Sequence, residues 1–152
     1  MTTDVKVVDI TNDGIPDIVV AVNGGPNLLY PGDADGAVVE YPRATPIGVE
    51  NENSQSVDVV DVDGDSDADV VFGNADGTAT TYYNIDGSLN PQPHKTGESG
   101  TDSHGLQVVA DFNGDGIMDL LTGTNAHSIV FLLHPLTLDR AFAPCRSEHH
   151  PW

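Results

Sequence analysis

The chain has 152 residues and a formal net charge of −19, because 24 acidic residues face only five lysines and arginines. This balance makes nucleic acid and anionic membranes poor partners, since both require basic patches, and it favours metal cations. The single cysteine excludes an internal disulfide framework, and no apolar run is long enough for a transmembrane helix.

Aspartate supplies most of the negative charge, with 19 Asp against 5 Glu. Aspartate favours turns and helix caps, whereas abundant glutamate is expected on solvated helices. The composition therefore predicts a fold without amphipathic helix surfaces. Eleven of the aspartates fall in three acidic loops, at residues 9–17, 61–69 and 111–119. The loops start 52 and then 50 residues apart, which indicates repeats of about fifty residues.

The pattern of each repeat predicts four short strands, because runs rich in Val, Ile, Leu and Tyr alternate with turn residues. The acidic loop joins the first two strands, and a glycine-rich turn joins the second and third. Asp35-Gly36 and Asp86-Gly87 mark the hairpin turns that follow. The strands are expected at residues 5–9, 17–22, 27–30 and 37–41, then 57–61, 69–72, 78–83 and 87–89, then 106–111, 119–122, 128–133 and 136–142.

The predicted fold class is all-β, with about three four-stranded antiparallel blades of the β-propeller type. The repeats occupy about residues 1–50, 51–100 and 101–143, with connections at 41–55 and 90–104 and an irregular tail at 144–152. Three blades do not close a propeller, which typically has four to eight, so we expect a partial propeller. The chain enters the first repeat at once, without a visible signal peptide, which suggests a piece of a longer protein.

The three acidic loops carry side-chain oxygens at the same positions, namely one, three, five and nine. Position seven would offer its backbone carbonyl, and position six is expected to need a positive φ, which glycine adopts most easily. Five protein oxygens plus water suit calcium, whereas magnesium demands a stricter octahedron. The predicted ligands are Asp9, Thr11, Asp13, Ile15 and Asp17, then Asp61, Asp63, Asp65, Asp67 and Asp69, then Asp111, Asn113, Asp115, Ile117 and Asp119.

Electrostatic repulsion within each loop also favours a bound cation. Two carboxylates about 5 Å apart repel by roughly 3 kcal/mol at an effective dielectric of 20. The alternative is a set of solvated hairpin turns, in which Asp and Gly are common, but three copies at matching offsets favour up to three Ca²⁺ ions. The second loop has the most carboxylates but carries Ser66 at position six. The first has Thr11 and Pro16 and ranks weakest, and the third is the most regular.

A family resemblance rests on these residues. Residues 111–121, led in by Ser103-His104-Gly105 and followed by Gly123, resemble the FG-GAP/VCBS repeat, as do residues 61–71 followed by Phe72-Gly73-Asn74. The resemblance covers roughly residues 4–140. It implies blades like those of the integrin α-chain propeller, with calcium held in the turn between the first two strands. Thr11, Ser66 and the missing turn glycine near His134 depart from the family pattern.

The function expected from this resemblance is that of a non-enzymatic calcium-binding module of a secreted or cell-surface protein. Calcium would be structural, and loops on one face would recognise an extracellular protein or glycan, as in adhesion, without nucleic acid binding or membrane insertion. No catalytic residues are expected. The alternative is a fragment of a propeller-containing polysaccharide lyase or hydrolase, which would need clustered basic residues, whereas Lys6, Arg43 and Lys95 are scattered in the sequence.

Overall fold

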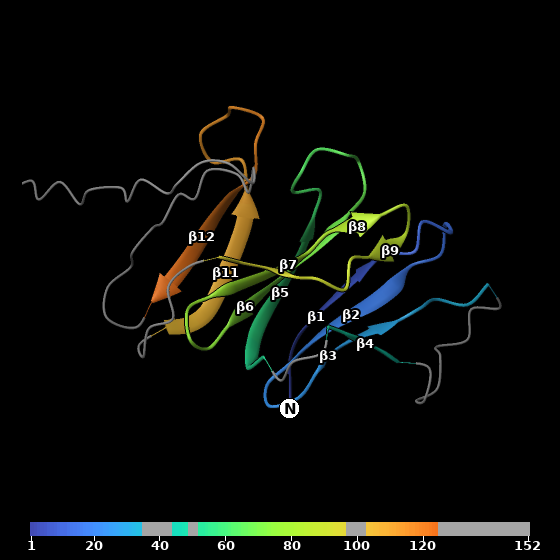
Figure 1. Cartoon of the computed structure of the whole chain (residues 1–152), viewed down its shortest axis with the longest axis horizontal. Coiled ribbons are helices and arrows are strands. Elements are labelled where there is room, and N and C mark those ends of the chain that lie inside the picture. Colours follow the sequence, from blue (N-terminus) through green and yellow to red (C-terminus); the bar gives the residue numbers. More distant parts are fainter. Residues whose placement is uncertain (35–43, 49–51, 97–102, 125–152) are drawn as a thin grey trace, which may run out of the picture.

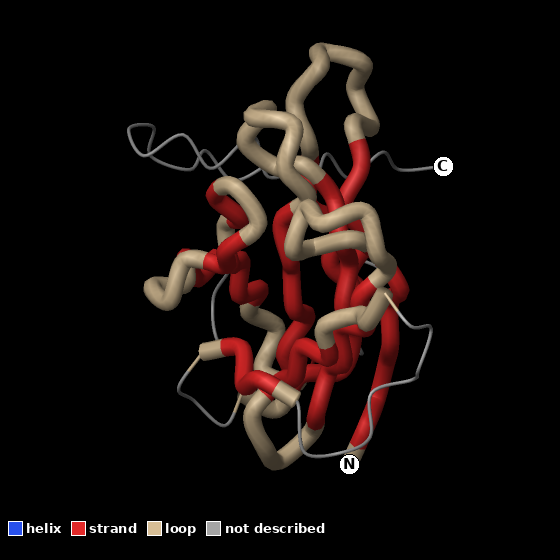
Figure 2. Tube along the Cα trace, turned by 90° about the vertical axis from the view of Figure 1, so that its right-hand side faces the viewer, coloured by secondary structure: helices blue, strands red, loops and turns tan. Residues whose placement is uncertain are grey.

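The computed structural model describes residues 1–34, 44–48, 52–96 and 103–124, and in the last segment it describes side chains only from 107 to 121. All regular elements in these segments are β-strands, and paired strands run antiparallel (Figure 2). The described part contains no helix with the length and hydrophobicity needed to cross a membrane. The all-β prediction is therefore confirmed.

The strands form successive blades that stand side by side (Figure 1). The first sheet has the order β1-β2-β3-β4, and the second has the order β5-β6-β7-β10. The third sheet contributes β11 and β12 within the described residues, and a small hairpin, β8-β9, follows β7 in the chain. The bounds are β1 Thr2–Val8, β2 Asp17–Val22, β3 Asn27–Tyr30, β4 Thr45–Ile47, β5 Ser54–Val60, β6 Asp69–Asn74, β7 Ala79–Tyr82, β8 Asn84–Ile85, β9 Ser88–Leu89, β10 His94–Thr96, β11 Ser103–Ala110 and β12 Asp119–Thr124.

The fourth strands differ from the sequence prediction. In the first blade β4 pairs with β3, although its residues were predicted to belong to an inter-blade connection. In the second blade, residues 88–89 pair with β8 instead of β7, and the fourth strand is β10, again inside a predicted connection. The reason is the Asp86-Gly87 turn, whose φ values of 51° and 81° fold the chain tightly back on β8.

Several predictions for the chain fall outside the described residues. These are the strands at 37–41, 128–133 and 136–142, the hairpin turn at Asp35-Gly36, and the tail at 144–152. The remaining predicted strands are all present, with shifts of a few residues at their ends.

The blades repeat one another in detail at the start of the first strand. The pairing register shifts between Thr2 and Asp4 in β1, between Ser54 and Ser56 in β5, and between Ser103 and Leu106 in β11. A β-bulge at such a place increases the local twist of the strand. Its recurrence at nearly the same distance before each acidic loop shows that the blades are structural repeats.

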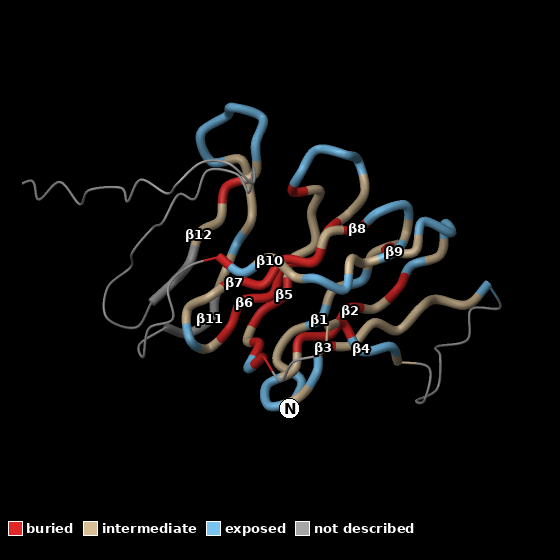
Figure 3. Tube along the Cα trace, in the orientation of Figure 1, coloured by how far each residue is buried: buried red, intermediate tan, exposed pale blue. Residues whose placement is uncertain are grey.

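The hydrophobic core lies between the blades. One cluster joins the first two blades and consists of Ile10, Val19, Ala21, Ile47, Val57, Val70, Phe72 and Tyr82. A smaller cluster of Val62, Val71 and Ala79 has Val109 and Leu120 of the third blade packed against it. The second sheet is thus covered on both faces, and every residue of β6 is buried (Figure 3). This two-sided burial explains why Val70, Val71 and Phe72 form a continuous apolar run in β6 instead of an alternating pattern.

The outer faces of the end blades are more exposed. Val5 and Val7 of β1 are 51% and 67% exposed, and Val108 and Phe112 of the third blade are 49% and 48% exposed. Phe112 occupies the same loop position as Ile10 and Val62, which are buried against the following blade. The difference follows from stacking, because this position packs toward the next repeat in the chain.

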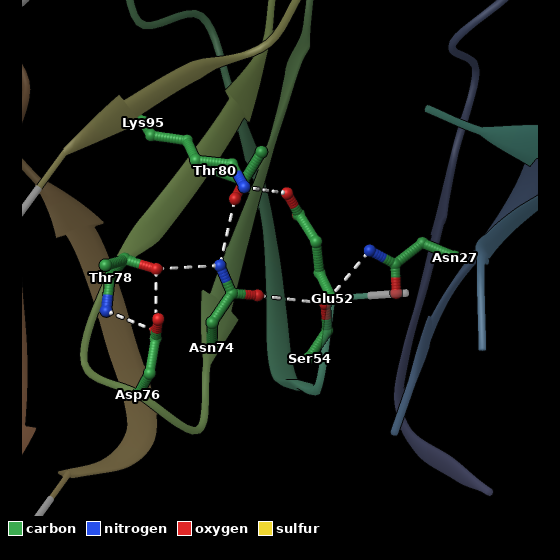
Figure 4. Close-up of polar contacts among 8 residues, drawn as sticks. All are labelled: Asn27, Glu52, Ser54, Asn74, Asp76, Thr78, Thr80 and Lys95. Carbon is green, nitrogen blue, oxygen red and sulfur yellow. Dashed lines mark hydrogen bonds and ion pairs between the residues drawn. The ribbon is translucent and has the colours of Figure 1, made fainter. Parts of the chain in front are cut away.

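A polar network crosses from the first blade to the second at the edge opposite the acidic loops (Figure 4). The Asn27 Nδ2 donates to Ser54 Oγ at 2.9 Å, and Ser54 Oγ donates to Asn74 Oδ1 at 3.1 Å. The Asn74 Nδ2 donates in turn to Thr80 Oγ1 at 2.9 Å. All four side chains are buried. Buried polar groups need hydrogen-bond partners, so loss of one of these bonds should lower the stability of the fold.

Replacing Ser54 with alanine is expected to lower the free energy of unfolding by about 1–3 kcal/mol, because it leaves buried groups of Asn27 and Asn74 without a partner. Urea unfolding measures this change. Ser88→Ala is the matched control, since Ser88 is exposed and should change stability by less than about 0.5 kcal/mol. Equal effects of the two substitutions would contradict the role given to the network.

Candidate metal centre

The three acidic loops lie at the same edge of the stacked sheets, each between the first two strands of its blade (Figure 1). Their middle residues are exposed, and their first and last residues connect to the strands (Figure 3). The shared strand–loop–strand plan places the three loops at equivalent positions in their blades.

The aspartate at position one organises each loop through its carboxylate. Asp9 accepts hydrogen bonds from the backbone N–H groups of Asp13 and Gly14, at 3.2 and 2.8 Å. The carboxylate of Asp61 accepts from Gly64 and Ser66 at 2.7 and 2.9 Å, and Asp111 accepts in the same way from Gly114, Asp115 and Gly116. These bonds favour the ionised form, and the pKa of Asp111 is lowered chiefly by the bond from Gly116.

Positions three and five add short turns inside the loop. The side-chain oxygens of Asp63 and Asn113 accept from the N–H of position five, at 3.2 and 2.8 Å. The carboxylates of position five, in Asp13, Asp65 and Asp115, accept from the N–H of position seven at 2.8–2.9 Å. Each loop therefore bends around its own acidic side chains, as Asp and Asn commonly do in turns.

The backbone takes a positive φ at position six in every loop, as predicted. The values are 84° at Gly14, 80° at Ser66 and 85° at Gly116. Position four is also left-handed, with φ values of 57°, 84° and 77° at Asn12, Gly64 and Gly114. The sequence analysis missed this second position, although Asn and Gly are the residues that adopt this conformation most readily.

The second loop gathers three carboxylates around one point. One oxygen each from Asp61, Asp63 and Asp65 lies within 4.8 Å of the other two. The pKa of Asp63 is raised by desolvation and, to a lesser extent, by repulsion from Asp65 and Asp61, against the opposing hydrogen bond from the N–H of Asp65. A divalent cation among these oxygens would relieve both effects. Three closely spaced carboxylate oxygens fit calcium by charge and by donor type.

The first and third loops hold fewer carboxylates at the same positions. Thr11 replaces an acid at position three of the first loop, and its Oγ1 is buried without a hydrogen-bond partner. Asn113 stands at this position in the third loop. Both side chains can still supply an oxygen to a hard cation. By charge, the second loop has the strongest attraction for such an ion.

Position nine has a second role that the sequence analysis did not foresee. Asp17, Asp69 and Asp119 are fully buried, and one oxygen of each accepts from the N–H of position two, at 2.8, 2.7 and 3.1 Å. The other oxygen of Asp17 accepts from Gly32, and that of Asp69 accepts from Asn84, each 15 residues later. Asp17 and Asp69 therefore tie their loops to the segment that follows the third strand of the blade.

Burial has an electrostatic cost at position nine of the second loop. It raises the pKa of the Asp69 carboxyl to about 6, against the opposing bonds from Asn84 and Val62. A raised pKa in the folded state means that the contribution of Asp69 to stability is largest at low pH and falls as the pH rises through about 6. A cation in the loop would offset this loss, because it favours the ionised carboxylate.

Position seven differs between the loops. Ile15 and Ile117 carry no side-chain oxygen, so only their backbone carbonyls could serve a metal. The carboxylate of Asp67 accepts from Asn12 Nδ2 at 2.9 Å and from the N–H of Asp86 at 2.7 Å. Its side chain thus binds neighbouring segments, which leaves the carbonyl as the predicted ligand.

Comparison with protein families identifies the family of the chain. The model of the FG-GAP-like repeat matches residues 9–72 and, again, residues 61–122. The chain belongs to the FG-GAP-like repeat family. Each match of this FG-GAP-like chain begins at one acidic loop and ends in the second strand of the next blade, so the family repeat and the structural repeat have the same period. No curated protein and no solved structure shows significant similarity to the chain.

Proposed function

We propose that this FG-GAP-like chain is a non-enzymatic, calcium-binding repeat module of the β-propeller type, in which calcium is structural. The observation that carries the proposal is the set of three equivalent acidic loops at one edge, with Asp61, Asp63 and Asp65 oxygens within 4.8 Å of one another in the second. Hard oxygen donors at this density suit calcium better than softer metals. The ligand set is the one given above for positions one, three, five, seven and nine.

Calcium would act by stabilising the loops against their own charge. Three ions would change the net charge from −19 by about six units, since each carries two positive charges. A site filled at a hundredfold excess over its dissociation constant stabilises the fold by about 2.7 kcal/mol. Extracellular calcium-binding modules have dissociation constants of about 10⁻⁴–10⁻³ M, which fits the proposed location in a secreted or cell-surface protein.

Recognition of a partner would use the opposite edge of the blades. A polar hollow of about 190 Å³ opens there, lined by Glu52, Asn53, Asn74, Ala75, Asp76, Thr78 and Lys95. Glu52 is buried and forms an ion pair with Lys95 at 2.9 Å (Figure 4). Charged and amide groups of this kind favour a polar surface, such as that of an extracellular protein or a glycan, as the partner.

Thermal unfolding of the whole chain with calcium and with chelator tests the structural role of the ion. Each filled site should raise the unfolding midpoint by roughly 5–10 °C, given about 2–4 °C per kcal/mol for a chain of this size. The control carries Asp13→Asn, Asp65→Asn and Asp115→Asn together, and its midpoint should not respond to calcium. A midpoint of the unmodified chain that is the same in calcium and chelator would overturn the proposal.

A further inference from the structure

The first and second acidic loops touch through a side-chain bridge. The Asn12 Nδ2, at position four of the first loop, donates to Asp67 Oδ1, at position seven of the second, at 2.9 Å. The other oxygen of Asp67 accepts from the N–H of Asp86 at 2.7 Å. Asn12 lies between two predicted ligands, Thr11 and Asp13, so the bridge constrains the backbone that positions both.

A buried asparagine also connects the two loops. Asn84 is fully buried, and its N–H donates to the position-nine ligand Asp69 at 2.8 Å. Its side-chain Nδ2 donates to the carbonyl of Ile10 in the first loop at 2.9 Å and to the carbonyl of Ala68 in the second at 3.2 Å. One residue outside both loops therefore holds the two of them in a fixed relation.

The β8-β9 hairpin makes a third contact, which involves both loops. Gly87, in its turn, lies so near the first loop that a methyl group there would collide with the backbone carbonyl oxygen of Thr11. The hairpin also carries Asp86, whose N–H binds Asp67. The first loop, the second loop and the hairpin thus form one packed unit.

We infer that the first and second calcium sites are thermodynamically coupled, so that an ion in one raises the affinity of the other. The inference rests on the proposed function. Ordering one loop by metal binding also orders the shared contacts of Asn12, Asn84 and Gly87, so the second ion meets a loop that loses less conformational freedom. Repulsion between the two ions opposes this effect, but physiological salt screens exposed charges over about 8 Å.

The second and third loops lack the residues of this bridge. Gly64 stands at position four of the second loop and has no side-chain amide, and Ile117 stands at position seven of the third and has no carboxylate. The Asn12–Asp67 hydrogen bond therefore has no side-chain counterpart between these two loops. This difference makes the second and third sites a control for the contribution of the Asn12–Asp67 hydrogen bond.

Calorimetric titration of full-length variants with CaCl₂ tests the coupling. Asp115→Asn leaves the first and second sites, and adding Asp65→Asn or Asp13→Asn leaves only one of them. Each lone site should bind calcium at least fivefold more weakly than the same site in the pair, the lower range of typical coupling. The control pair, left by Asp13→Asn alone, should differ from its single sites by less than about twofold.

Asn12→Gly then tests the bridge itself. Glycine suits the positive φ of position four and already occupies it in the other two loops, so the fold should tolerate the change. In the Asp115→Asn background this substitution should reduce the coupling factor by at least half. Equal affinities of lone and paired sites, or coupling unchanged by Asn12→Gly, would overturn the inference alone. No calcium binding to the unmodified chain would instead overturn the proposed function and the inference with it.

Discussion

Replacing Asp69 with alanine is expected to destabilise the chain by about 2–6 kcal/mol even in chelator. Asp69 is fully buried and accepts the N–H groups of Val62 and Asn84, and each buried donor left without an acceptor costs about 1–3 kcal/mol. These bonds exist without a metal ion. The loss should therefore persist in chelator, and it should be larger in calcium because Asp69 is also a predicted ligand.

Asp65→Ala is the matched control, because Asp65 lies in the exposed part of the same loop and the hydrogen bond that it accepts from the N–H of Asp67 is also exposed. It should cost up to about 3 kcal/mol in calcium and little in chelator. Urea unfolding of both variants in both conditions measures the difference. If Asp69→Ala were harmless in chelator, position nine would be a metal ligand without a structural role.

The pH dependence gives an independent measure of the same residue. The pKa of Asp69 is raised to about 6 in the folded chain, so its carboxyl contributes most stability below the unfolded pKa of 3.8 and loses this contribution as the pH rises through about 6. In chelator, Asp69→Ala should therefore be more damaging at pH 5 than at pH 7. The opposite order would contradict the burial effect.

Replacing Gly87 with alanine is expected to cost about 2–5 kcal/mol. Its φ of 81° is unfavourable for an L-residue by about 1–2 kcal/mol. The added methyl group would also collide with the carbonyl oxygen of Thr11, and overpacking typically costs another 1–3 kcal/mol. The hairpin would have to move away from the first loop.

Gly24→Ala isolates the steric part of this effect. Gly24 has a φ of 80° and open space around the position of a Cβ atom, so only the backbone cost of about 1–2 kcal/mol should appear. The difference between the two variants, measured by urea unfolding, reports the contact between the hairpin and the first loop. Equal costs would show that Gly87 is required by its turn alone.

The sequence predicts those features of the fold that depend on local pattern. The three loops, their flanking strands and the positive φ at Gly14, Ser66 and Gly116 all follow from residue types within a window of about ten residues. The repeat period of about fifty residues then places the loops at one edge. Local propensity decides these elements because each is closed by its own side chains.

Features that depend on contacts between blades could not be predicted. β4 and β10 are three-residue strands whose pairing with β3 and β7 fixes them, because such short segments carry little propensity of their own. In the sequence Asn84 looks like an ordinary turn residue, although its side-chain amide donates a hydrogen bond to the carbonyl of Ile10, 74 positions earlier. The structural role of position nine could not be predicted either. An aspartate is expected there both as a metal ligand and as a buried hydrogen-bond acceptor, so the residue type does not distinguish the two roles.

The complete burial of β6 gives the chain an uneven resistance to opening. This strand has neighbours on both faces, whereas the outward face of β1 bears exposed valines. Backbone amides in β6 should therefore exchange with deuterium last, and exchange should advance from the two end blades toward the middle. Any additional blade stacked on β1 would shift this slow-exchanging centre toward the amino terminus.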